Sequence, residues 1–165
     1  MRTLLWFETI DLTKERTRVI EFRKDSFKES FGNSSDFDEH DYLIWLQEQV
    51  KNFPDGFVMV EERGKTIGQL ELSIRSFQGK DIGYVHLFYL IPEKRGLGLG
   101  KELYAYANEF FNNNNVEEFH LRVSPTNVRA LHFYQKNGMV EAGTEVNGKV
   151  IRMKGSLYKN DLKNF

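Results

Sequence analysis

A glycine-rich segment between two regular elements carries the residues best suited to bind an anion. Residues 95–100 read RGLGLG, directly after an apolar strand-like stretch and directly before an amphipathic helical one. Glycines lack Cβ atoms, so backbone N–H groups at a helix start can converge on an anion, and Arg95 adds a charge that pairs with phosphate. The segment therefore predicts either a phosphate-binding loop or a tight turn that requires small residues.

Two common phosphate-binding loops do not fit this segment. A P-loop needs Ser or Thr after its lysine to bind magnesium, but Glu102 follows Gly100-Lys101. A dinucleotide fingerprint needs G-x-G-x-x-G in the first βαβ unit of a parallel sheet. Here the glycines alternate at Gly96, Gly98 and Gly100, and strands of antiparallel type precede them. Both readings are therefore excluded.

The spacing that fits is R-x-x-G-x-G, and with it the chain resembles the GNAT N-acetyltransferase superfamily. A second stretch is similar to the family's N-x-x-A-x-x-x-Y-x-K-x-G helix, through Asn127, Ala130, Tyr134, Lys136 and Gly138. The two motifs occur in the family's order and at its separation. The resemblance covers residues 57–158 well, and the first 56 residues only through their strand–helix–helix order.

The resemblance implies that acetyl-CoA is the cosubstrate, with no metal, and that two segments bind it. In the family, backbone groups of the strand before the loop bond the pantetheine arm, and a bulge or splayed strand would free them from the sheet. The loop binds the pyrophosphate, and the Asn bonds the pantetheine or only caps its helix. The matching positions are Phe88, Leu90, Arg95, Gly96, Leu97, Gly98, Leu99, Gly100, Lys101 and Asn127.

Two side chains are expected to move protons. Tyr134 resembles the family's proton donor to the departing CoA thiolate, and plain core packing is the alternative. Family members use a histidine, a strand carboxylate or a water chain as the base. His86 shares a strand face with Phe88 and Leu90 if no bulge intervenes, and its unperturbed pKa of about 6.5 suits the task. Alternatively, His86 only forms a hydrogen bond at the surface. Glu71 on the preceding strand is the other candidate for the base.

These residues need elements to position them, and the apolar pattern predicts a mixed α/β chain in the order β-α-α-β-β-β-α-β-α-β-β. The resemblance implies a mostly antiparallel, twisted sheet of about seven strands with about four helices. Strands are expected over residues 6–12, 57–62, 65–77, 81–91, 118–123, 139–146 and 149–157. Helices are expected over residues 14–30, 41–52, 99–111 and 128–137.

The length of 165 residues suits a single acetyltransferase domain. We divide it into an acceptor-side strand and helices (1–56), an acetyl-CoA-binding core (57–138) and a C-terminal hairpin (139–165). Asn147-Gly148 supplies the turn of that hairpin.

Composition excludes several classes of function. The 23 Lys and Arg residues against 24 Asp and Glu lack the basic excess of a nucleic-acid binder. The sequence has no cysteine, which rules out disulfides, thiolate catalysis and Cys-type zinc sites. No stretch reaches the roughly 18–20 apolar residues of a membrane span or resembles a secretory signal. A cytoplasmic protein without nucleic-acid or membrane partners is therefore expected, and a homodimer is compatible with the sequence.

The expected activity is transfer of acetyl from acetyl-CoA to a primary amine by direct attack in a ternary complex. A non-catalytic acyl-CoA-binding sensor module is the alternative, and a nucleotide-binding regulatory domain is a third reading. The acceptor is less defined: a cationic small molecule, a peptide N-terminus or a lysine would suit the acidic excess of residues 1–62. Asp36, Asp38, Glu39 and Asp41 form an acidic segment that either attracts such a cation or starts a helix.

Overall fold

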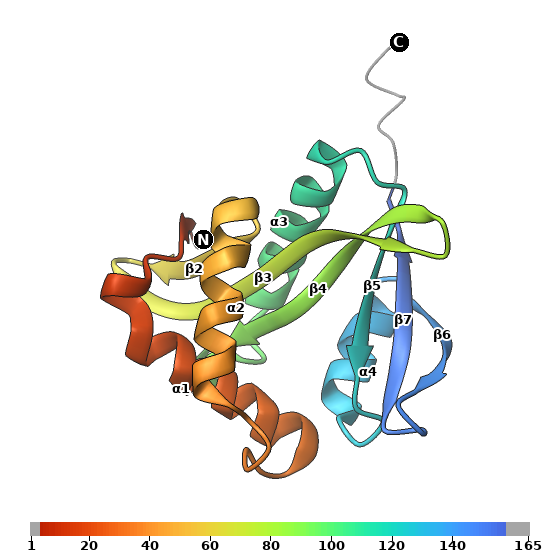
Figure 1. The fold of residues 1–165 in the computed structure, drawn as a ribbon, viewed down its shortest axis with the longest axis horizontal. Coiled ribbons are helices and arrows are strands. Elements are labelled where there is room, and N and C mark those ends of the chain that lie inside the picture. Colours follow the sequence, from red (N-terminus) through yellow and green to blue (C-terminus); the bar gives the residue numbers. More distant parts are fainter. Residues whose placement is uncertain (1–3, 158–165) are drawn as a thin grey trace.

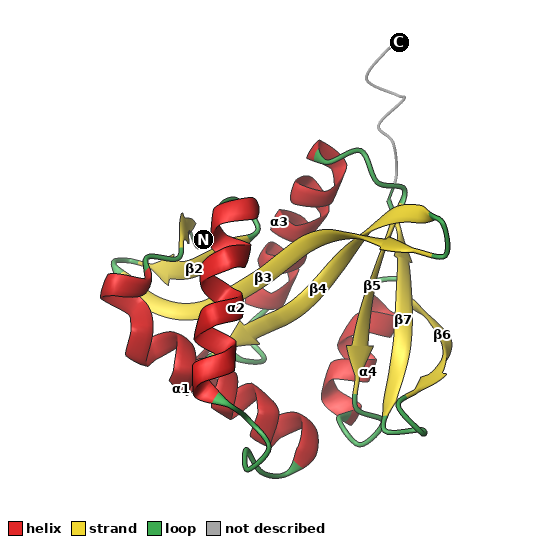
Figure 2. Cartoon of the chain, in the orientation of Figure 1, coloured by secondary structure: helices red, strands yellow, loops and turns green. Residues whose placement is uncertain are grey.

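The structure, a computed structural model, describes residues 4–157, whose strands form one seven-stranded sheet with helices on both faces (Figures 1 and 2). The strands are β1 (Leu5–Thr9), β2 (Phe57–Glu62), β3 (Lys65–Phe77), β4 (Lys80–Leu90), β5 (Glu118–Val123), β6 (Val140–Glu145) and β7 (Val150–Ser156). The helices are α1 (Leu12–Phe31), α2 (Glu39–Asn52), α3 (Leu99–Asn113) and α4 (Val128–Lys136), with a 3-10 turn η1 (Pro92–Lys94).

The sheet order is β1-β2-β3-β4-β5-β7-β6, and the pairing is antiparallel everywhere except between β4 and β5. The parallel pair follows from the β4–α3–β5 crossover, which returns the chain in the same direction. The expected mixed, mostly antiparallel sheet is therefore confirmed.

Capping residues fix where the first two helices begin. Asp11 accepts a hydrogen bond from the Thr13 backbone N–H, and Asp38 does the same for the N–H of Asp41. These caps explain two differences from the expected bounds. The strand expected over residues 6–12 ends at Thr9 because the chain must turn to cap α1, and α2 begins earlier than residue 41 because Asp38 is its cap.

The two helix layers pack on opposite faces of the sheet, with α1 and α2 on one and α3 and α4 on the other (Figure 1). On the α3 face, Phe111 stacks on Phe119 of β5 with ring centroids 5.0 Å apart. Gly83 of β4 lies beneath that pair, where a Cβ would stand 2.4 Å from the Phe111 ring. Among the helices of residues 4–157, none is both long and apolar enough to cross a bilayer.

Candidate active site

A single extra residue bends β4 in the middle of the sheet. The register between β3 and β4 skips His86, so the residues on either side of it pair with consecutive residues of β3. Such a bulge kinks a strand and turns side chains to new faces. The His86 ring therefore packs against Trp45 of α2, with centroids 5.0 Å apart, whereas Phe88 packs against Phe133 of α4 at 5.4 Å. The expected alternation of His86 with Phe88 on one face is broken.

Immediately beyond the bulge, β4 separates from β5. The two strands pair only where Gly83–Val85 lie opposite Phe119–Leu121, and they diverge after that (Figure 1). The edge of β4 that faces β5 consequently has no strand partner over residues 86–90. A free strand edge presents N–H and C=O groups that an extended ligand can bond.

A cavity of about 410 Å³ lies beside this free edge. Four parts of the chain enclose it: α1, the end of β4, the loop that leads into α3, and α4. Its lining residues are Ser26, Glu29, Ser30, Phe88, Tyr89, Leu90, Arg95, Gly96, Gly98, Gly100, Lys101, Asn127, Arg129, Ala130, Phe133, Tyr134, Lys136 and Asn137.

The start of α3 lies at one end of the cavity. Gly98 is the N-cap, with φ of 83°, and no side chain caps the helix. The first backbone N–H groups of α3 are thus left for a ligand, at the positive end of the helix dipole. A Cβ at Gly98 would meet no atom within 4 Å, so its left-handed backbone, rather than crowding, favours glycine there.

Arg95 joins this loop to α1. Its guanidinium donates through Nε to the Leu90 carbonyl at 2.8 Å and through Nη2 to Asp25 at 2.9 Å, and its Nη1 lies 3.4 Å from Glu29. Its charge is therefore shared with two carboxylates. Further cations on the cavity wall are Lys101, Arg129 and Lys136.

Helix α4 supplies the remaining polar groups of the wall. Asn127 caps α4 by accepting a hydrogen bond from the Ala130 N–H at 3.2 Å while also lining the cavity. The Tyr134 ring lies edge-on to Phe88, with centroids 6.2 Å apart. Burial raises the pKa of the Tyr134 hydroxyl above its ordinary value. At neutral pH the hydroxyl is protonated and available as a donor.

The two candidates for the base lie outside the cavity lining. His86 Nε2 is 2.7 Å from the Ser73 hydroxyl, and burial together with Arg23 and Arg75 lowers the pKa of the His86 imidazole to about 3. Glu71 is fully buried, and burial raises the pKa of its carboxyl. Arg23 of α1 contacts both residues: its Nη1 donates to the Glu71 carboxylate at 2.6 Å and to the His86 backbone carbonyl at 3.2 Å.

Most of the residues that the sequence predicted to bind acetyl-CoA lie together on the cavity wall, and Tyr134 lies with them. The exceptions are Leu97, which is 64% exposed, and Leu99, the first residue of α3, which is buried. Sequence reasoning missed Arg129, although its charge within the α4 motif was a signal. It also missed the α1 residues Ser26 and Ser30, for which no local motif exists.

A second cavity of about 380 Å³ lies between the start of α1 and strands β1 and β2. Its lining is mostly acidic, so it would repel a polyphosphate such as CoA. The lining residues are Glu8, Thr9, Asp11, Lys14, Glu15, Met59 and Glu61.

Solved structures share this fold at low sequence identity. Ard1 from Thermoplasma volcanium superposes with a TM-score of 0.73 at 17% identity, covering 94% of this chain and 99% of that one. The PaiA N-acetyltransferase from Thermoplasma acidophilum, in complex with coenzyme A, gives a TM-score of 0.70 at 20% identity, covering 93% and 99%.

Sequence comparison identifies the family. An uncharacterised N-acetyltransferase of Archaeoglobus fulgidus is 32% identical over 100 residues, which are 59% of this chain and 66% of that relative. The match thus spans a little less than two thirds of the relative's length. Residues 17–139, which include both the glycine loop and the α4 motif, match the family described as Acetyltransferase (GNAT) family. Together with the bulged β4, the free strand edge and the open start of α3, this match shows that the chain belongs to the GNAT acetyltransferase family.

Proposed function

We propose that this protein transfers the acetyl group of acetyl-CoA to a primary amine by direct attack in a ternary complex. The observation that carries the proposal is the continuity of one cavity from the uncapped start of α3, along the free edge of β4, to Tyr134. The start of α3 suits the pyrophosphate, the free edge of β4 suits the pantetheine arm, and the region beside Tyr134 suits the thioester.

The chemistry requires one bond to form and one to break. The amine nitrogen attacks the thioester carbonyl carbon, a C–N bond forms, and the C–S bond breaks. The Tyr134 hydroxyl donates a proton to the departing thiolate. The amine proton leaves to a base, for which His86 remains our prediction, with Glu71 and a water chain as the alternatives. The sequence has no cysteine that could carry the acetyl group, so direct attack is the simplest route.

The low pKa of His86 limits its part in this step. With a pKa of about 3 the imidazole is neutral at physiological pH, free to accept a proton but only weakly basic. Its position at the bulge, rather than its basicity, favours it over solvent. Glu71 is a poorer candidate because Arg23 and Tyr42 already bond its carboxylate.

An assay of acetyl transfer tests the proposal. Purified protein is mixed with acetyl-CoA and a panel of primary amines, and mass spectrometry detects the acetylated amine while a thiol reagent measures free CoA. We expect equal amounts of acetylated amine and CoA. Acetyl-CoA binding without turnover on any amine would favour a sensor module. Binding of ATP in preference to acetyl-CoA would favour a nucleotide-binding regulatory domain.

A further inference from the structure

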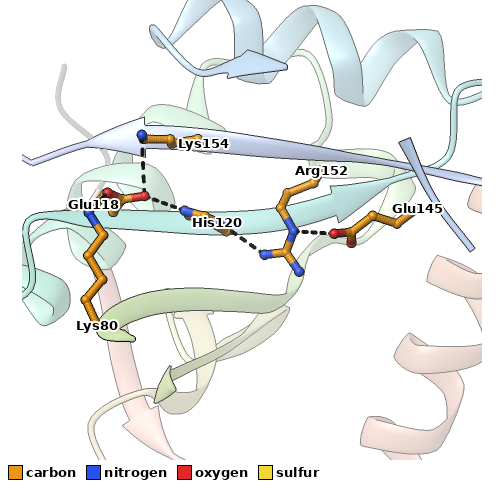
Figure 3. A network of polar contacts seen from close by, with 6 residues as sticks. All are labelled: Lys80, Glu118, His120, Glu145, Arg152 and Lys154. Carbon is orange, nitrogen blue, oxygen red and sulfur yellow. Dashed lines mark hydrogen bonds and ion pairs between the residues drawn. The ribbon is translucent and has the colours of Figure 1, made fainter. Parts of the chain in front are cut away.

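One half of the sheet is left without a helix on the α1 and α2 face. These two helices lie in front of β1, β2 and part of β3 and β4, whereas on the same face the far end of the β3–β4 hairpin and strands β5, β7 and β6 have no helix in front of them (Figure 1). Charged side chains occupy this uncovered area, most of them from β5 and β7 (Figure 3). We call its basic members the cationic face, made up of Arg75, Lys80, Arg122, Arg152 and Lys154, of which Arg152 is buried against the Phe77 ring.

The carboxylates of this area do not balance its cations. Glu118 pairs with both Lys80 and Lys154, the second at 3.6 Å. Glu145 accepts from Arg122 and from Arg152, each at 2.8 Å. Each carboxylate is therefore shared by two cations, and the area keeps a positive excess that attracts anions.

Arg75 is the member of the cationic face that is free to bind a ligand. Within residues 4–157 its side chain takes part in no ion pair or hydrogen bond, and the residue is exposed. Its guanidinium lies over the Tyr84 ring, with Cζ 4.6 Å from the ring centroid. Stacking on an aromatic ring fixes the plane of the guanidinium and leaves its edge donors available for two parallel bonds to a carboxylate or phosphate.

This free arginine stands close to the point where β4 leaves β5. Tyr84 belongs to the short paired stretch of the two strands, and its ring lies 4.8 Å from the ring of His86, the bulge residue. The cavity for the cosubstrate opens on the α4 side of β4, where Phe88 meets Tyr134. A second substrate that approaches the same point from the uncovered side therefore passes Arg75.

We propose that the amine acceptor carries an anionic group, a carboxylate or a phosphate, beside its primary amine, and that Arg75 binds this group while the amine points toward the end of the β4–β5 pairing. The assignment rests on the proposed acetyl transfer and names its acceptor class. Arg122 and Arg152 add to the positive field, and each already donates through its Nε to Glu145.

The acidic segment at the start of α2 has structural partners that account for two of its members. Asp38 caps α2, and Glu39 pairs with Lys24 of α1 at 2.6 Å. These contacts fix the start of α2 without a ligand. A cationic acceptor, which that segment suggested, is thus the competing outcome in the test.

Binding is measured first, independently of turnover. The Nε–Hε resonance of Arg75, identified by its loss in Arg75→Gln, is followed while the wild-type protein is titrated with three-carbon amines in phosphate-free buffer. β-Alanine carries a carboxylate, n-propylamine carries no second charge, and 1,3-diaminopropane carries a cation. We expect a saturable shift with β-alanine only. No shift with β-alanine, or an equal shift with n-propylamine, would overturn the proposal.

Turnover is then compared as a ratio of kcat/KM for β-alanine over n-propylamine. We expect the wild-type ratio to favour β-alanine by about tenfold or more and Arg75→Gln to abolish the preference, mainly through KM. Arg16→Gln, the same change at an exposed arginine of α1, should keep it. O-phosphoethanolamine in place of β-alanine shows whether phosphate or carboxylate is preferred.

The outcomes separate the two proposals. Product from all amines at equal kcat/KM, or a preference for 1,3-diaminopropane, would leave acetyl transfer intact and overturn the anionic acceptor. An Arg75 shift with β-alanine but no acetylated product from any amine would leave the anion site intact and overturn acetyl transfer.

Discussion

Removal of a single hydroxyl group tests the role of Tyr134. Tyr134→Phe keeps the ring that contacts Phe88, so the affinity for acetyl-CoA should be nearly unchanged. We expect kcat to fall by about 10²–10⁴-fold, because the thiolate loses its proton donor. Tyr104→Phe is the matched control, since the Tyr104 hydroxyl points to the Asn137 carbonyl at 3.5 Å and Tyr104 does not line the cavity. Wild-type kcat in Tyr134→Phe would assign the donor role to solvent.

The buried imidazole of His86 should weaken the fold in acid. Its pKa is about 3 in the folded protein and about 6.5 when unfolded, so between these pH values the unfolded chain binds more protons. The free energy of unfolding should therefore fall as the pH falls from 6.5 towards 3. His86→Asn should reduce that slope by up to about 1.4 kcal/mol per pH unit. Urea denaturation at several pH values measures it.

The exposed His132 of α4 provides the matched control for this experiment. His132→Asn makes the same substitution at an exposed histidine and so measures the effect of the replacement itself. Equal slopes in all three proteins would mean that the His86 ring titrates normally and is not held neutral by its surroundings.

At the scale of elements, the loop before α3 can be tested with two glycines in the same backbone conformation. Gly98 and Gly64 have φ values of 83° and 78°, and a Cβ at either would meet no atom within 4 Å. Valine strains both backbones alike, but only Gly98 lines the cavity. We expect Gly98→Val to weaken acetyl-CoA binding about tenfold or more, which is about 1.4 kcal/mol, and Gly64→Val to leave it unchanged. Calorimetry measures the affinity for acetyl-CoA. If the affinity falls equally in both variants, the loop is only a turn and does not bind the cosubstrate.

The elements themselves could be predicted from the sequence because their signals are local. Strands β2, β3 and β5 have the expected bounds, since each alternates or is apolar between clear turn residues. The bulge at His86 could not be predicted, because it depends on the register between two strands and not on the residues of β4 alone. The missed bulge is also why His86 was expected on the face of Phe88.

For the molecule as a whole, the contribution of α1 to the cavity lay beyond sequence reasoning. The cavity-lining residues from β4, the loop and α4 were recognisable because motifs of fixed spacing carry them. Ser26, Ser30 and the Asp25–Arg95 ion pair reach the same cavity only through tertiary packing across a sequence separation of 70 residues. No local pattern encodes such a contact.

Amide hydrogen exchange with and without acetyl-CoA tests most directly the claim that the cosubstrate lies along the free edge of β4. Peptides covering residues 86–101 should exchange at least about tenfold more slowly in saturating acetyl-CoA, because the ligand occupies backbone groups that no strand or cap satisfies. Peptides covering the acidic cavity between β1, β2 and α1 should be unaffected. Protection of that second cavity, with residues 86–101 unchanged, would contradict the account.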